Sequence, residues 1–237
     1  MGPKRSDKTV GIIGGMGPEA TAELMRQIIR ATPAEDDCDH VRMIVDNDPE
    51  IPSRIKAIIE GGGEDPGPYL ADMGKRLEQW GADFLAMPCN TAHYYYDVIQ
   101  QAVAIPLLNM IELTADRISN ETPEIKRLGV LASPAVFTTG ILDRAFKRRE
   151  IELLAPGKDE QEEVLVAIKR IKAGDCGEKV AGTLSVVCRK LVEKGAEALL
   201  IACTELSIIG DDLSAPVRHY DSCRILADDI VQKARKD

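Results

Sequence analysis

Two stretches of the chain, residues 81–89 and 195–203, repeat one pattern. Each begins with glycine, alanine and an acidic residue, continues through an apolar run and ends at a cysteine, Cys89 in the first stretch and Cys203 in the second. The segment before each glycine is typical of a helix that ends at glycine ahead of a buried strand. This internal duplication predicts two similar α/β units, each with a cysteine at the carboxyl end of a strand.

Two further pairs of segments extend the duplication. Residues 10–13 correspond to 128–131, and residues 105–107 correspond to 215–217, so the offsets are 118, 114 and 110 residues, too long for a solenoid repeat. Short apolar runs alternate with helical segments in both halves, which indicates parallel sheets joined by right-handed crossovers. We therefore expect an α/β fold of two similar parallel-sheet domains related by a pseudo-twofold axis, with the active site in the cleft between them.

The periodicity of apolar residues places the individual elements. We expect strands at 9–13, 41–45, 84–87, 105–108, 128–132, 151–153, 199–202 and 217–220. We expect helices from Pro18 onward and at 70–80, 95–102, 139–149, 161–172, 179–194 and 222–234. The predicted first domain is 8–111, joined by the C-terminal segment 221–237 because the last helix should pack on the first half. The predicted second domain is 112–220.

Composition excludes several classes of function. The net charge of -9 argues against a nucleic-acid partner, because such binding depends on clustered lysine and arginine. No apolar run approaches the roughly 20 residues of a membrane-spanning helix, and the amino terminus lacks the apolar stretch of a secretory signal. We expect no membrane partner and a cytoplasmic location. The 6 cysteines include no C-x-x-C pair, which favours reduced thiols over disulfides or a metal centre.

The two matched cysteines carry the clearest chemical signal. Cys89 and Cys203 each follow a strand and precede a helix, where backbone N–H groups and the helix dipole favour a thiolate and can hold a carboxylate. A lone cysteine is more commonly a small buried hydrophobe, but two at matched positions favour catalysis. A thiolate facing a thiol can remove a proton from one face of a carbon acid and return one to the other, which inverts a stereocentre without a cofactor. Asn90, Thr91 and Thr204 are placed to stabilise the developing charge.

Residues 14–18, 87–93 and 202–206 resemble the motifs of the aspartate/glutamate racemase family, specifically its aspartate racemase branch. The resemblance runs from Val10 to the last helix. It implies a pyridoxal-independent racemase that acts on a small anionic amino acid, aspartate and/or glutamate, with catalytic Cys89 and Cys203 and with neither cofactor nor metal. The substrate-binding residues that we expect are Met16, Arg54, Asn90, Thr91, Ser133, Lys172 and Thr204.

Within this resemblance, Arg54 and Lys172 are the expected ligands of substrate carboxylates. Without the family resemblance, the simplest interpretation of Arg54 is a solvated charge in a loop, and that of Lys172 is a cation at the carboxyl terminus of a helix. The chain departs from the family pattern at Ser53, where aspartate is usual, and at 131–138, where threonines and glycine are common. These departures leave open whether the substrate is aspartate, glutamate or a broader set.

Glu205 and His93 each allow two interpretations. Glu205 is close enough to Cys203 to orient or activate it, although a glutamate in a first turn also suits a helix start. His93 is a possible support for Cys89, or it satisfies a local hydrogen bond. His219 is expected to line the cleft, because its strand-end position parallels Asn109.

Other functions stay open at this point. Residues 15–20 match the dinucleotide pattern G-x-G-x-x-A, with Asp46 as a possible ribose ligand, but Pro18 removes an N–H donor from the phosphate turn. A sibling reaction on the same scaffold, such as hydantoin racemisation, maleate isomerisation or arylmalonate decarboxylation, is a nearer alternative. A third is a non-catalytic binding protein for acidic amino acids. We also expect a homodimer, and a loose loop at 61–68 that is either a lid or a connection.

Overall fold

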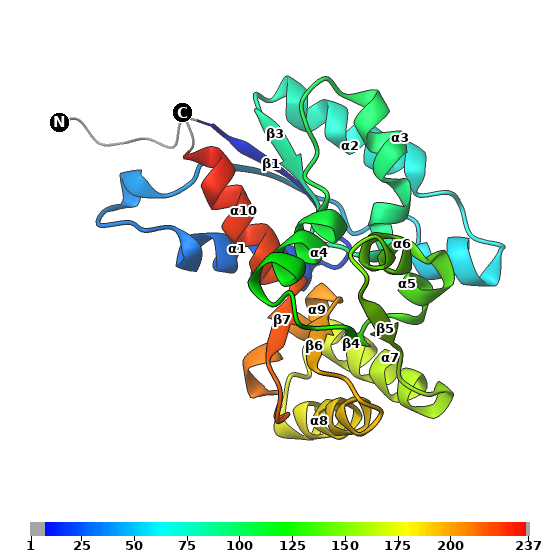
Figure 1. The fold of residues 1–237 in the computed structure, drawn as a ribbon. Coiled ribbons are helices and arrows are strands. Elements are labelled where there is room, and N and C mark those ends of the chain that lie inside the picture. Colours follow the sequence, from blue (N-terminus) through cyan, green and yellow to red (C-terminus); the bar gives the residue numbers. More distant parts are fainter. Residues whose placement is uncertain (1–7, 236–237) are drawn as a thin grey trace.

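Two parallel sheets organise the chain, for which a computed structural model describes residues 8–235 (Figure 1). The first sheet has the order β2-β1-β3 and the second has the order β5-β4-β6-β7. Their strands are β1 (Val10–Gly14), β2 (Met43–Asn47), β3 (Phe84–Ala86), β4 (Arg127–Leu131), β5 (Glu152–Leu154), β6 (Ala198–Ile201) and β7 (His219–Asp221). Every strand pairing is parallel. The expected α/β fold with two parallel sheets is confirmed.

The duplication is visible in how the sheets are built. β1 lies between β2 and β3, and β4 lies in the same way between β5 and β6. Gly11 of β1 and Gly129 of β4 occupy matching positions, since an added Cβ would come within 2.8 Å of Leu85 and 2.7 Å of Leu199, respectively. Leu85 and Leu199 are themselves equivalent in the repeat. The glycines therefore allow the same close approach of a neighbouring side chain in both halves.

Helices surround both sheets (Figure 1). They are α1 (Pro18–Ala31), α2 (Gly67–Gln79), α3 (Tyr96–Ala102), α4 (Met110–Glu121), α5 (Pro134–Thr139), α6 (Ile141–Lys147), α7 (Lys158–Lys172), α8 (Glu178–Glu193), α9 (Thr204–Ser207) and α10 (Ser222–Ala234). Short 3₁₀ segments span Asp37–Asp39, Thr91–Tyr95 and Gly210–Asp212, and a π-helical turn spans Lys56–Glu60. None of the helices within residues 8–235 is long and apolar enough to cross a membrane.

The last helix returns to the first sheet. α10 lies beside α1 in Figure 1, and its buried Leu226 and Ile230 share one core cluster with Val10 and Ile12 of β1. The amino end of α10 meets the second sheet instead, because Asp221 at the end of β7 caps the helix by accepting from the N–H groups of Cys223 and Arg224. This helix therefore ties the two sheets together.

The structure differs from the expected elements at two places. Residues 105–108 form an isolated parallel bridge between Leu85 and Leu107 instead of a full strand. The bridge consists of two backbone bonds, in which the N–H of Leu85 donates to the oxygen of Pro106 and the N–H of Leu108 donates to the oxygen of Leu85. The helix expected at 139–149 is two helices, α5 and α6, which meet at Gly140 with φ +61°.

The helix α4 was not predicted from the sequence. Asn109 caps this helix, since its side-chain oxygen accepts from the N–H groups of Ile111 and Glu112. Its buried positions include Met110 and Ile118, which follow a helical spacing. An asparagine cap ahead of an apolar 3.6-residue pattern was the available signal.

Gly15 is a position where the fold needs glycine. Its φ is +94°, and an added Cβ would lie 2.0 Å from the backbone oxygen of Asp48, which cannot move as a side chain could. Gly15→Ala is therefore expected to lower the free energy of unfolding by about 2–4 kcal/mol, through a steric clash and a strained backbone. Urea unfolding measures this, with Gly62→Ala as the matched control because nothing lies within 4 Å of a Cβ there. Equal stability of both variants would contradict the prediction.

Candidate active site

A small cavity of about 70 Å³ lies at the carboxyl ends of strands from both sheets. This is far below the roughly 300–1,000 Å³ of pockets for drug-sized ligands, so it suits a ligand of few heavy atoms. Its lining includes every substrate-binding residue expected from the sequence, both matched cysteines and Glu205. The lining residues are Met16, Ser53, Arg54, Ile55, Cys89, Asn90, Thr91, Ser133, Ile168, Lys172, Ala202, Cys203, Thr204 and Glu205.

The parallel sheets explain why residues so far apart in sequence meet here. Met16 follows β1, Cys89 follows β3, Ser133 follows β4 and Cys203 follows β6. The carboxyl ends of parallel strands lie along one edge of a sheet, which is where open α/β sheets bind ligands. A hydrogen bond of 3.2 Å between the hydroxyls of Thr91 and Ser133 joins the two halves at the cavity.

The Cys203 thiol is buried and has a carboxylate partner. Its Sγ lies 3.2 Å from Oε2 of Glu205 and donates to it. Burial raises the pKa of Cys203 well above its usual range, and the charge and hydrogen bond of Glu205 act in the same direction. Lys172 opposes this shift in pKa. Cys203 is thus held as a thiol.

The Cys89 thiol has a different electrostatic environment. Burial raises the pKa of Cys89, whereas the nearby guanidinium of Arg54 lowers it, and the charge of Glu205 raises it further. Arg54 thus lowers the pKa of Cys89 with a smaller contribution from Lys172, whereas Lys172 is the cation that lowers the pKa of Cys203.

Glu205 connects several parts of the site. Its Oε1 lies 3.2 Å from Nζ of Lys172 and accepts a 3.3 Å hydrogen bond from the N–H of Gly17, while Oε2 accepts from Cys203. Glu205 is 5% exposed. One buried carboxylate thus joins the loop after β1, the end of α7 and a thiol of the second half.

The same contacts argue against a dinucleotide-binding site at residues 15–20. The N–H of Gly15 donates to the hydroxyl of Thr21, and the N–H of Gly17 donates to Glu205. A phosphate at this helix start would need those donors and would meet the carboxylate of Glu205. The N–H groups of this loop are instead hydrogen-bonded within the protein, to Thr21 and Glu205.

Two cations, Arg54 and Lys172, line the cavity, so its charge favours an anion despite the chain's net charge of -9. Nη1 of Arg54 donates to the backbone oxygens of Ile51 at 3.2 Å and Pro52 at 2.8 Å, which anchors the guanidinium on its own loop. Lys172 reaches the cavity from the last turn of α7. Since Glu205 is the one carboxylate in the described lining, the lining has an excess of positive charge.

Two buried polar atoms of the lining have no partner among the described residues, Oδ1 of Asn90 and the hydroxyl of Thr204. Nδ2 of Asn90 donates to the hydroxyl of Ser222 at 3.0 Å, and that hydroxyl donates to Ile201, which fixes the orientation of the amide. The free atom of Asn90 is therefore an acceptor, suited to an ammonium group rather than to the developing negative charge for which the sequence suggested it. Unpaired buried polar atoms are rare, and a ligand would satisfy both.

His93 is adjacent to Cys89 in the fold but does not line the cavity. Its Nε2 accepts from the N–H of Met110 at 3.0 Å, so Nδ1 carries the proton and donates to the backbone oxygen of Cys89 at 2.9 Å. Burial lowers the pKa of His93, which keeps the ring neutral. This histidine holds the backbone of Cys89, and its nitrogens are not available to the thiol.

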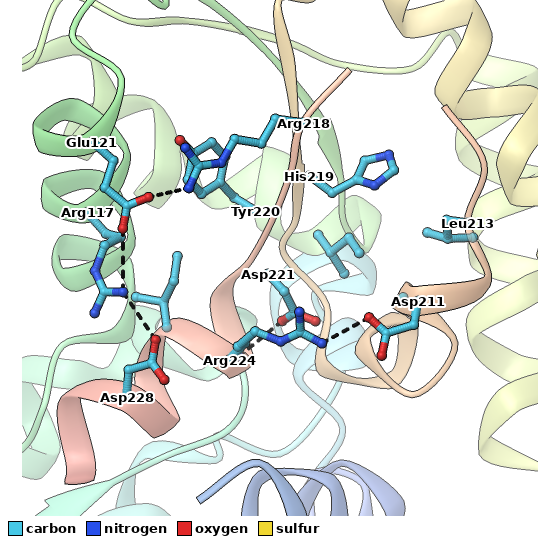
Figure 2. Close-up of a pocket in the computed structure, with 13 residues that line it drawn as sticks. Arg117, Glu121, Asp211, Leu213, Arg218, His219, Tyr220, Asp221, Arg224 and Asp228 are labelled. Carbon is cyan, nitrogen blue, oxygen red and sulfur yellow. Dashed lines mark hydrogen bonds and ion pairs between the residues drawn. The ribbon is translucent and has the colours of Figure 1, made fainter. Parts of the chain in front are cut away.

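His219 lines a different pocket, so its expected place in the cleft was wrong. Figure 2 shows this larger pocket, of about 440 Å³, beside β7, α4 and α10. Its arginines are already paired with carboxylates: Arg117 with Asp228, Arg218 with Glu121 and Arg224 with Asp211. No cysteine is present in its described lining. The analogy with Asn109 failed because β7 is the edge strand of its sheet, and His219 lines the pocket beside that edge.

The fold, the cavity and the comparisons with known proteins together indicate that this protein is a racemase, which is a kind of isomerase. The chain belongs to the Asp/Glu/hydantoin racemase family, whose model matches residues 13–230. The family resemblance expected from the sequence is confirmed.

Individual relatives agree with this assignment. The broad specificity amino-acid racemase RacX of Bacillus subtilis is 27% identical over 228 residues, which cover 94% of this chain and 96% of that protein. The aspartate racemase of Picrophilus torridus is 33% identical with a TM-score of 0.86, covering 97% of this chain and 95% of that one. A Francisella tularensis glutamate racemase, in complex with D-glutamate, shares the fold at 18% identity and a TM-score of 0.69, covering 96% of this chain and 81% of that one.

Proposed function

We propose that this protein is a cofactor-independent racemase of acidic amino acids, aspartate and/or glutamate, which uses Cys89 and Cys203 as a thiolate and thiol pair. One observation carries the proposal: two thiols from matched strand ends line one small cavity together with Arg54 and Lys172. A single thiol would suffice to deliver a proton in a decarboxylation, whereas inversion of a stereocentre needs a proton acceptor and a proton donor on opposite faces.

In the proposed reaction, one cysteine as thiolate removes the α-proton and the other as thiol protonates the opposite face of the carbanion. The α-proton is only weakly acidic, so negative charge that develops on the α-carboxylate must be stabilised. The unpaired hydroxyl of Thr204 and the nearby cations are suited to that task. The two cysteines exchange their protonation states in each turnover.

The preference for a dicarboxylic substrate rests on charge. Arg54 and Lys172 can each bind one carboxylate, and Oδ1 of Asn90 can accept from the α-ammonium group. The small cavity and the aspartate and glutamate racemases among the structural neighbours support the same substrate class. The broad specificity of the Bacillus relative supports a wider range as the second candidate.

Proton exchange in deuterated water tests this function. Purified protein incubated with single enantiomers of aspartate or glutamate should replace the α-proton by deuterium, seen by NMR, while the optical rotation decays toward zero. Removal of pyridoxal phosphate and chelation of metals should leave the rate unchanged. Retention of the α-proton with all acidic enantiomers would leave only binding, and a rate lost on either treatment would contradict a cofactor-free reaction.

A further inference from the structure

A buried serine lies behind the cavity lining and contacts Asn90. Ser222, the first residue of α10, is fully buried and is not part of the lining. Its hydroxyl accepts from Nδ2 of Asn90 at 3.0 Å and donates to the backbone oxygen of Ile201 at 3.0 Å. Asn90 directly follows Cys89, and Ile201 lies two residues before Cys203. One hydroxyl from the last helix therefore joins the segments that carry the two thiols.

The donors and acceptors in these two bonds leave the Asn90 amide one orientation. The backbone oxygen of Ile201 can only accept, so the hydroxyl proton of Ser222 is used on that bond. Asn90 must then donate to Ser222, which requires its amide nitrogen on that side. The reverse orientation would place Oδ1 against a hydroxyl with no proton left to give. Ser222 therefore leaves Oδ1, an atom that can only accept, as the free arm of the Asn90 amide.

We propose that Ser222 is a positioning residue that makes the cavity selective for ligands with an α-ammonium group, because it holds Oδ1 of Asn90 as the acceptor for that group. This inference rests on the substrate class of the proposed function. It adds a residue outside the cavity that decides what Asn90 recognises. An ammonium group only donates, so it binds an amide oxygen and is repelled by an amide N–H.

The other side-chain acceptors of the lining are less suited to this role. Both carboxylate oxygens of Glu205 already have hydrogen-bond or ion-pair partners within the protein. The hydroxyl of Thr204 is unpaired, but a hydroxyl can donate as well as accept, so it does not discriminate between an ammonium group and other polar groups. Among the unpaired buried side-chain atoms of the described lining, Oδ1 of Asn90 is thus the one that only accepts.

Loss of the Ser222 hydroxyl should weaken this selectivity. In Ser222→Ala, Nδ2 of Asn90 is left buried without its acceptor, which is unfavourable, so the amide is free to turn its N–H toward a ligand that can accept. Three dicarboxylates of equal chain length separate the outcomes, since at the same carbon aspartate carries an ammonium group, malate a hydroxyl and succinate only hydrogen. Aspartate needs Oδ1, malate can bond to either arm of the amide, and succinate bonds to neither.

Calorimetric titration of L-aspartate, L-malate and succinate into Ser222→Ala tests the proposal. We expect the dissociation constant of aspartate to rise about tenfold, because a hydrogen bond to a charged group is lost, and those of malate and succinate to change less than about twofold. Ser222→Cys keeps nearly the same size with a weaker acceptor, so it should shift the aspartate affinity in the same direction by less. Equal weakening of all three ligands, or an unchanged aspartate affinity, would overturn the proposal.

The matched control is Ser185→Ala. It removes a buried hydroxyl of α8 that likewise accepts one hydrogen bond and donates another, but lies outside the cavity lining. Its affinities for the three ligands should equal those of the unchanged protein. A loss confined to aspartate in this control as well would assign the effect to general destabilisation and overturn the role of Ser222.

Exchange of the α-proton by the unchanged protein tests the proposed function separately. Exchange with aspartate, together with equal weakening of all three ligands in Ser222→Ala, would overturn the role of Ser222 alone. Absence of exchange, together with a loss of affinity confined to aspartate, would contradict the proposed function and support the role of Ser222 in recognition of the ammonium group.

Discussion

Replacing either Cys89 or Cys203 with serine is expected to reduce racemisation by at least about a thousandfold, because each turnover needs a proton acceptor and a proton donor on opposite faces. A serine hydroxyl is a far weaker acid than a thiol, so it cannot form the anion that abstracts the α-proton near neutral pH. Polarimetry with single enantiomers measures the loss.

The matched control is Cys38→Ser, which changes an exposed cysteine outside the cavity. Its racemisation rate should equal that of the unchanged protein. Full turnover in either the Cys89 or the Cys203 variant would remove that sulfur from the mechanism.

Arg54→Ala is expected to lower kcat/KM for acidic amino acids by roughly 10–150-fold, mainly through KM. The reason is that hydrogen bonds to charged groups contribute about 1.5–3 kcal/mol each. The guanidinium is anchored by the backbone oxygens of Ile51 and Pro52, so it presents a fixed cation to the ligand. Steady-state kinetics on aspartate and glutamate measure the effect.

Two further variants define the cause of that loss. Arg54→Lys retains the charge without the planar fork and should fall between Arg54→Ala and the unchanged protein. Arg30→Ala removes an exposed arginine of α1 that is not part of the cavity lining, and it should leave KM unchanged. An unchanged KM in Arg54→Ala for every acidic substrate would reject Arg54 as a carboxylate ligand.

The sequence predicted the parts of the site that depend on local pattern. The repeat places Cys89 and Cys203 at strand ends, and parallel strands bring their carboxyl ends to one edge, so the meeting of the two halves at one cavity followed from topology. Arg54 and Lys172 came from the family resemblance, and both line that cavity. The roles of these residues stay predictions, as do the homodimer and the domain boundaries.

The contacts between the halves could not be predicted in this way. The bond from Gly17 to Glu205 and the orientation of Asn90 toward Ser222 join residues far apart in the chain. They depend on how side chains pack after the sheets have formed. His93 shows the same limit, because one of its two backbone partners, Met110, begins α4, a helix that was not predicted from the sequence.

The central claim is that Cys89 and Cys203 act on opposite faces of one substrate carbon. The most direct measurement is α-proton exchange in deuterated water by Cys89→Ser and Cys203→Ser, each tested on pure L and pure D enantiomers of aspartate and glutamate. Each variant should exchange one enantiomer only, and the two variants should exchange opposite ones. Exchange of the same enantiomer by both variants, or of both enantiomers by either one, would contradict the claim.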